Sequence, residues 1–260
     1  MPNVPARAYM LCTTPRSGST LLCRMLAATG VAGQPDSHFH TPSLSRWLQV
    51  YGLEAQVFDT RKDALRAVIE AALMRGTGET GCFGLRMQRG SFPYAMAQFA
   101  GLYPGLPTDR ARLETAFGPM RFLHLSRADK VAQAVSRLRA EQGGLWHARA
   151  DGSALERSAP TAPLHYDRAA IAAHVAELSR WDEAWAAWFA QEGITPLRLS
   201  YAALAETPRN VLAQALGYLG RDASAASGVR IPTARLANAE SAEWVARFRA
   251  ETDAAIPPRS

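Results

Sequence analysis

Cysteine is scarce in this sequence, which has three in 260 residues: Cys12, Cys23 and Cys82. Each lies among apolar residues, and the chain has neither a CxxC pair nor a cysteine and histidine cluster with metal-ligand spacing. These absences exclude a disulfide framework and a cysteine metal site. We expect three buried, reduced thiols in a cytoplasmic protein, and no metal cofactor.

Long apolar runs are also missing. No window approaches the roughly 18 apolar residues of a membrane-spanning helix, and the N-terminal stretch MPNVPARAYMLCTT lacks the apolar centre of a signal peptide. The sequence therefore predicts a soluble, intracellular protein without a transmembrane segment.

The chain has no surplus of acidic residues either, because 29 Lys and Arg outnumber 23 Asp and Glu and give a formal net charge of +6. The basic surplus is mostly arginine, and it is scattered along the chain rather than gathered in a run. This distribution favours separate sites for phosphate groups over a nucleic-acid-binding stripe, so we expect an anionic ligand and no nucleic-acid partner.

The hydrophobic pattern alternates between short apolar runs and longer segments of helical period. With 48% hydrophobic residues, the chain is long enough for one large core, and we expect a single domain over residues 1–260. The alternation predicts an α/β fold with a central parallel sheet flanked by helices. The expected strands cover 8–12, 82–87, 121–126 and 195–200, and the expected helices cover 19–30, 61–76, 128–142, 167–193, 207–219 and 241–251.

Two segments of this pattern carry further expectations. Residues 143–163 form the one long stretch without periodicity, and a loop of that length in a compact domain predicts a lid or a mobile binding loop. In the helix over 167–193, Trp181, Trp185 and Trp188 recur at spacings of four and three, which predicts an aromatic stripe packed against the sheet.

The stretch TTPRSGST joins the first expected strand to the first helix. Gly18 lets the backbone approach an anion closely, Ser17, Ser19 and Thr20 add hydroxyl donors, and Arg16 adds a fixed positive charge. A helix N-terminus at a strand end is a natural site for phosphate. The nucleoside-triphosphate pattern is not met, because Thr13 replaces its first glycine and Ser19 replaces its lysine. The turn therefore predicts a phosphate site without a metal-bound triphosphate.

A second strand, turn and helix repeats this arrangement in the stretch FLHLSRADKVAQAVS. Arg127 stands at the turn, and Ser136 lies on the helix that follows. Two phosphate-sized sites at two strand ends predict a ligand that carries two separated phosphates.

With these two motifs the sequence resembles the Stf0-type sulfotransferases, which use 3′-phosphoadenosine-5′-phosphosulfate (PAPS). This group includes trehalose 2-sulfotransferases and is related to bacterial nodulation and lipopolysaccharide sulfotransferases. The resemblance rests on four stretches in order, namely PRSGSTLL, ATGVAGQP, SRADKVAQAVS and SAEWVARFR, and so spans most of the chain. It implies a sulfotransferase fold like that of P-loop nucleotide kinases. It also implies transfer of a sulfuryl group from PAPS to a hydroxyl of a sugar, a glycolipid or another small acceptor, with 3′-phosphoadenosine 5′-phosphate as the product.

The resemblance also implies roles for individual residues. The stretch from Arg16 through Ser17, Gly18 and Ser19 to Thr20 would hold the 5′-phosphosulfate, and Arg127 with Ser136 would hold the 3′-phosphate. Arg235 would approach the nucleotide from a C-terminal segment, and Arg86 would line the acceptor side. For Arg86 a solvent-exposed charge at a strand end is the alternative. Relatives often form homodimers, for which the aromatic helix and the C-terminal helix are the candidate interfaces.

The sequence departs from the family where an acceptor hydroxyl must lose its proton. The family carries a glutamate general base in the loop after the first helix, but Ser37 stands at that position in GQPDSHFH. Asp36, His38 and His40 are the neighbouring groups that can act as a base. Alternate residues of an extended loop point the same way, so we expect these three to share a face, with His38 or Asp36 as the base and His40 third.

Two other functions remain open from the sequence. A relative that binds PAPS without turnover would explain the missing glutamate. A small-molecule kinase on the same fold would bind Mg-ATP rather than PAPS, although the missing lysine speaks against it.

Overall fold

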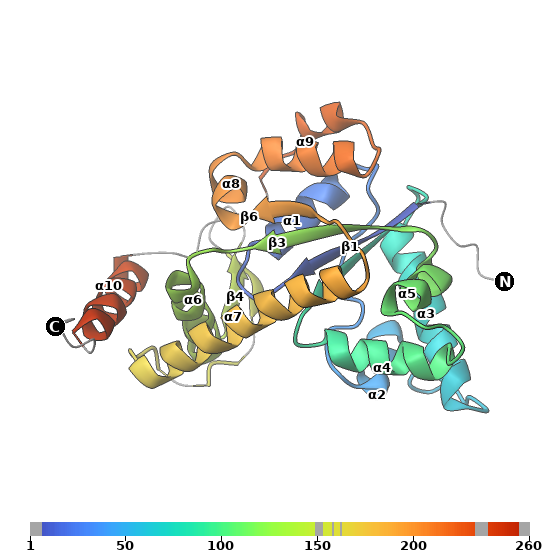
Figure 1. The fold of residues 1–260 in the computed structure, drawn as a ribbon, viewed down its shortest axis with the longest axis horizontal. Coiled ribbons are helices and arrows are strands. Elements are labelled where there is room, and N and C mark those ends of the chain that lie inside the picture. Colours follow the sequence, from blue (N-terminus) through green and yellow to red (C-terminus); the bar gives the residue numbers. More distant parts are fainter. Residues whose placement is uncertain (1–6, 149–152, 158, 162, 232–238, 255–260) are drawn as a thin grey trace.

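The computed structural model describes residues 7–148, 153–157, 159–161, 163–231 and 239–254. Its centre is a parallel sheet of the strands β1 (Arg7–Thr13), β2 (Cys82–Gln88), β3 (Met120–Ser126) and β6 (Leu197–Ser200), in the spatial order β2-β1-β3-β6. Helices cover both faces (Figure 1). The predicted fold class is therefore confirmed.

Strand β1 shows why both faces of the sheet are covered. Its alternate residues Met10 and Cys12 belong to one hydrophobic cluster, whereas Tyr9 and Leu11 belong to another. A strand that is apolar at every position from Ala8 to Cys12 cannot leave either face in water. The first cluster includes residues of α3 (Arg61–Thr77), α4 (Phe92–Leu102), α5 (Asp109–Phe117) and α7 (Arg168–Gln191), and the second includes residues of α1 (Ser19–Ala28), α8 (Tyr201–Glu206) and α9 (Pro208–Tyr218).

Two of the three tryptophans in the predicted stripe of α7, Trp185 and Trp188, are buried against the sheet, whereas Trp181 is half-buried and packs beside α6. Trp188 meets Phe92 and Phe122 at ring-centroid distances of 4.9 Å and 5.7 Å. Trp185 is completely buried, and its indole N–H donates to the carbonyl of Thr13 at 3.0 Å. The helix therefore packs on the sheet and also holds the last residue of β1.

Four helices were not distinguished by the sequence pattern: α4, α5, α8 and α2 (Leu44–Tyr51). Helix α2 buries only two of its residues, Leu44 and Trp47. The side chain of Ser43 caps this helix by accepting a hydrogen bond from the backbone N–H of Arg46.

The segment over residues 143–163, which has no periodicity in its sequence, contains regular structure in its described part. It contains a two-stranded antiparallel sheet of β4 (Leu145–Ala148) and β5 (Ala154–Arg157). Helix α6 (Lys130–Gly143) leads into it, and Gln142 at the end of α6 is hydrogen-bonded to the backbone of His165 after it. Local pairing of two short strands left no periodicity that the sequence alone could reveal.

The remaining elements are a short 3-10 helix, η1 (Ala223–Ala226), and α10 (Ala239–Asp253), which packs on α6 beside α7 (Figure 1). Cys12, Cys23 and Cys82 are free and buried, as expected. No helix in the described part of the chain has the length and apolar character needed to cross a membrane.

We expect the central strand to carry much of the fold's stability. Leu11 of β1 is completely buried in the hydrophobic cluster between the sheet and α1, so Leu11→Ala should lower the free energy of unfolding by about 2–5 kcal/mol. Val57, with 96% of its surface exposed, provides the control, and Val57→Ala should change stability by less than about 0.5 kcal/mol. Urea denaturation measures both, and equal effects of the two substitutions would contradict the assignment of Leu11 to the core.

Candidate functional site

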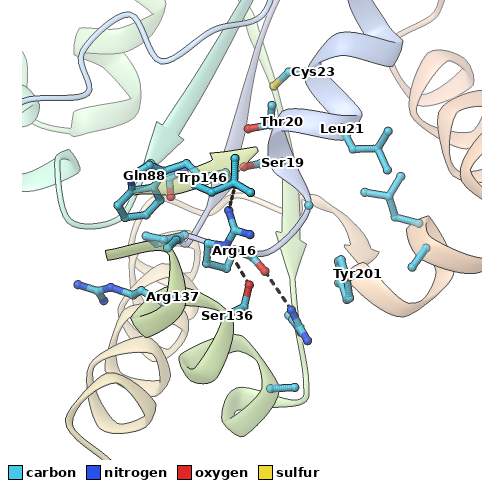
Figure 2. Close-up of a pocket in the computed structure, with 18 of the residues that line it drawn as sticks. Arg16, Ser19, Thr20, Leu21, Cys23, Gln88, Ser136, Arg137, Trp146 and Tyr201 are labelled. Carbon is cyan, nitrogen blue, oxygen red and sulfur yellow. Dashed lines mark hydrogen bonds between the residues drawn. The ribbon is translucent and has the colours of Figure 1, made fainter. Parts of the chain in front are cut away.

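The carboxyl ends of β1 and β3 open into a cavity of about 2210 Å³. Parallel sheets bind ligands at this edge, because the turns and helix N-termini that follow the strands gather there. The lining includes Gly18 and Arg127, together with Arg16 and Ser136, which are labelled in Figure 2. The two predicted phosphate sites therefore belong to one cavity.

The turn between β1 and α1 is shaped by two residues, Arg16 and Gly18, whose backbones adopt the left-handed conformation. Gly18 has φ of 87° and forms the N-cap of α1, where no side chain caps the helix. A Cβ atom at Gly18 would lie 3.0 Å from Cδ2 of Tyr201, and the positive φ would strain any other residue, so both the space and the backbone favour glycine. Arg16 has φ of 64°. The first N–H groups of α1 are thus available to an anion in the cavity.

Arg16 is held at the centre of the cavity wall. Its Nε donates to Oγ of Ser136 at 3.0 Å, and its Nη1 donates to the carbonyl of Trp146 on β4 (Figure 2). Nη1 of Arg127 donates to the carbonyl of Arg16 at 3.4 Å. Three residues predicted from two separate motifs, Arg16, Arg127 and Ser136, are therefore brought into direct contact.

The hydroxyl groups of the turn face in different directions. Ser19 and Thr20 line the cavity, as expected. The side chain of Ser17 is completely buried and hydrogen-bonded to Oγ1 of Thr13, which also donates to the carbonyl of Leu125 at 3.0 Å. The expectation of a ligand-facing hydroxyl at Ser17 is therefore wrong, because this hydroxyl holds the turn to the end of the sheet.

Arg86, near the end of β2, links the loop after α1 to the stretch TTPRSGST, residues 13–20, which we call the phosphate turn. Its Nη1 donates to Oγ1 of Thr20 at 2.6 Å, and its Nε donates to Oγ of Ser37 at 2.7 Å. Its Nη2 lies 3.5 Å from Oδ1 of Asp36. Only 15% of the Arg86 side chain is exposed, so the alternative of a solvent-exposed charge is wrong.

The loop after α1 is fixed beside β2. Asp36 forms an isolated parallel bridge with Leu85, and its carbonyl accepts a hydrogen bond from the N–H of Arg86 at 2.9 Å. Asp36 and His40 are exposed and line the cavity together with Ser37. The carboxylate of Asp36 is 70% exposed and open to a ligand.

His38 points the other way, so the expectation that it shares a face with Asp36 and His40 is wrong. It is 4% exposed and stacked on Phe83, and its Nδ1 is hydrogen-bonded to the hydroxyl of Tyr51 at 2.8 Å. Burial lowers the pKa of His38 to about 4. A neutral imidazole enclosed by aromatic rings cannot reach an acceptor in the cavity.

The cavity is strongly basic. Eight arginines line it, against the three acidic residues Asp36, Glu141 and Glu206. Arg127 lies over the ring of Tyr201, 4.4 Å from its centroid. Burial lowers the pKa of Arg127, but an arginine pKa is normally so high that the guanidinium stays charged. The described residues contain no group of three or more His, Cys, Asp or Glu that could hold a metal ion. The cavity is therefore suited to a ligand with several negative charges.

Three further cavity residues were not assigned a role from the sequence, or only in passing. Tyr201 supports Arg127 from the first position after β6, and Gln88 ends β2. Trp146, which lies in the stretch over 143–163 expected to form a lid or binding loop, provides the carbonyl that holds Arg16. The available signal was position at the carboxyl end of a strand, since Gln88 is the last residue of β2 and Tyr201 directly follows β6. Arg235 lies outside the described residues.

Comparison with known proteins identifies close relatives. The model of the Stf0 sulphotransferase family matches residues 8–251. A trehalose 2-sulfotransferase of Mycobacterium tuberculosis (strain ATCC 35801 / TMC 107 / Erdman) is 32% identical over 94% of this chain and 95% of its own. A trehalose 2-sulfotransferase of Mycolicibacterium smegmatis (strain ATCC 700084 / mc(2)155) is 29% identical over 93% and 94%. Among solved structures, the sulfotransferase domain of the Synechococcus PCC 7002 olefin synthase matches 98% of this chain and 90% of its own, with 15% identity and a TM-score of 0.47.

The buried state of His38 predicts an acid-sensitive fold. In the unfolded chain its pKa is about 6.5, so the unfolded state binds the proton first as the pH falls. The contribution of neutral His38 to the free energy of unfolding is therefore fully present above pH 6.5. It falls by about 3 kcal/mol as the pH is lowered to 4. Urea denaturation of the wild type between pH 7 and 4 should show this loss, and His38→Gln should reduce it.

His40→Gln is the matched control, because His40 is exposed. It should retain the full acid-dependent loss. If His40→Gln and His38→Gln reduced the loss equally, burial of His38 would not be its cause.

Proposed function

The chain belongs to the Stf0 sulphotransferase family, and on this premise we propose that it transfers the sulfuryl group of PAPS to a hydroxyl group of a sugar, a glycolipid or another small acceptor. The two curated relatives named above are trehalose 2-sulfotransferases, which supports a carbohydrate acceptor. The family match over residues 8–251 supports one catalytic domain.

The observation that carries the proposal is the meeting of Arg127 with the phosphate turn at Arg16. One strand end alone offers a single anion site, which many nucleotides and inorganic phosphate would fill. Two anion sites in one cavity suit a nucleotide with phosphate groups at both its 5′ and 3′ ends.

We assign the 5′-phosphosulfate to Arg16, the hydroxyls of Ser19 and Thr20, and the backbone N–H groups that begin α1. The free N-terminus of α1 and the close approach allowed at Gly18 fit that group. We assign the 3′-phosphate to Arg127 and Ser136. When bound, the donor would supply an activated sulfuryl group.

We assign proton removal from the acceptor hydroxyl to Asp36. Its carboxylate lies on the cavity wall 3.5 Å from Arg86, which also contacts Thr20 of the phosphate turn. The acceptor proton thus moves to a carboxylate beside the transferred group. Arg86 and Arg16 stabilise the negative charge that spreads over the peripheral oxygens during transfer. His40 lines the same wall and is the second candidate.

Binding of the donor without turnover is the second candidate function. Ser37 stands where the family's glutamate is expected, and here its hydroxyl accepts a hydrogen bond from Arg86 instead of facing a substrate as a base. The kinase alternative has no comparable support, because Ser19 occupies the position of the lysine that binds the β- and γ-phosphates.

Nucleotide binding provides the first test. Adenosine 3′,5′-bisphosphate should raise the melting temperature of the wild type more than Mg-ATP does, and Arg16→Ala or Arg127→Ala should each weaken its binding about tenfold to a hundredfold. Arg66→Ala is the control, because Arg66 is exposed on α3, forms an ion pair with Asp63 and is not among the residues that line the cavity. A wild type that is not stabilised by the bisphosphate, or arginine variants that respond like the wild type, would exclude PAPS as the donor.

Sulfate transfer from labelled PAPS to a panel of sugars tests the base. Asp36→Asn removes the proton acceptor with almost no change of shape, so kcat should fall by about 10²–10⁴ while the bisphosphate still binds. Asp59→Asn, an exposed aspartate outside the cavity, should retain wild-type kcat. If Asp36→Asn keeps its kcat and His40→Gln loses it, His40 is the base. Bisphosphate binding with no transfer to any sugar by the wild type would favour the function without turnover.

A further inference from the structure

Lys130, the first residue of α6, lies at the centre of a polar network beside the cavity. Its ammonium donates to Oδ2 of Asp182 on α7, to the carbonyl of Arg127 and to Oε1 of Gln133, the last at 3.3 Å. A lysine ammonium has three N–H groups, so all of them are used. The side chains of Lys130 and Asp182 are only 18% and 21% exposed.

Gln133 continues the network into the phosphate turn. It is completely buried, and its Nε2 donates to Oγ1 of Thr14 at 3.0 Å and to the carbonyl of Pro15 at 2.6 Å. Both amide hydrogens and the amide oxygen of Gln133 are therefore used, and their partners fix which way round the amide lies. Because every polar atom of the Gln133 amide and every N–H of the Lys130 ammonium is used, these two side chains are held in one arrangement.

The network joins the two predicted anion sites. Gln133 of α6 holds Thr14 and Pro15. Arg127, directly after β3, donates to the carbonyl of Arg16. Three consecutive residues of the phosphate turn are therefore bonded to the segment formed by β3 and α6. Lys130 in turn holds the carbonyl of Arg127. The positions of the two arginines are thus set relative to each other by hydrogen bonds at both ends.

We propose that Lys130 and Gln133 are positioning residues that fix the spacing between the two anion sites and thereby make the protein select a nucleotide with two phosphates over one with a single phosphate. This inference rests on the function proposed above. Two sites held at the correct spacing let the second phosphate bind without further ordering of the protein, whereas a loose pair would use part of its binding energy to become ordered.

The role is one of positioning because the network does not reach the ligand. Of the described residues that line the cavity, none is Lys130, Gln133 or Asp182. Substitutions in the network should therefore act through Arg16 and Arg127 and leave the acceptor wall, which is formed by Asp36 and Arg86, unchanged.

The test compares adenosine 3′,5′-bisphosphate with adenosine 5′-phosphate by calorimetric titration of the full chain at fixed ionic strength. The measured quantity is the ratio of the two dissociation constants, which is the gain from the 3′-phosphate. For the wild type we expect a gain of about tenfold to a hundredfold. Gln133→Met removes the amide at nearly constant volume and should lower the gain about tenfold, with a smaller effect on the monophosphate.

Gln142→Met is the matched control. Gln142 is a buried glutamine on the same helix, 6% exposed, and its amide bonds the backbone of His165 instead of the phosphate turn. Both substitutions should lower the melting temperature, but only Gln133→Met should lower the gain. The double substitution Lys130→Met with Asp182→Asn removes the ion pair without leaving a buried charge, and it should lower the gain as Gln133→Met does.

The outcomes separate the two proposals. A gain that falls in the network variants but not in Gln142→Met supports the positioning role. A wild type with the expected gain whose network variants retain it, or lose no more than Gln142→Met, overturns the positioning role and leaves the proposed donor intact. A wild type that binds both nucleotides equally overturns the proposed donor and the positioning role together.

Discussion

The register of the parallel sheet is the constraint on which the site depends. Thr13, the last residue of β1, pairs with Gln88 of β2 and Leu125 of β3, and Ser126 pairs with Ser200 of β6. All four strands therefore end at nearly one level. The residues that follow them emerge side by side, which is why Arg127 after β3 lies over Tyr201 after β6. A shift of one residue in any pairing would turn these side chains to opposite faces.

Burial of β1 on both faces keeps that register in place. Because its alternate residues fill two separate hydrophobic clusters, any slippage would expose one set and overpack the other. The end of the strand is held in addition by Trp185, whose indole donates to the carbonyl of Thr13. The rigid part of the site is therefore an extension of the core, and the acceptor wall is joined to it through Arg86.

The sequence predicted what local patterns determine. Alternating strands and helices gave the sheet, and a strand followed by arginine, small residues and a helix gave Arg16, Arg127 and Ser136 their places. The direction of His38 was mispredicted, because period-two reasoning assumes an extended chain and the loop is held instead by Leu85, Phe83 and Tyr51, which are distant in sequence. Ser17 was misassigned for the same reason, since its partner hydroxyl on Thr13 is bonded to a neighbouring strand.

The backbone of Arg16 limits how this turn can evolve. A left-handed backbone conformation at a residue other than glycine costs on the order of 1–3 kcal/mol. Here it is adopted by Arg16, the residue whose side chain we assign to the phosphosulfate. Selection for stability alone would favour glycine or asparagine at this position, whereas selection for anion binding retains arginine. Thermostabilised descendants obtained without a binding screen would therefore tend to lose function first at this residue, while their fold improved.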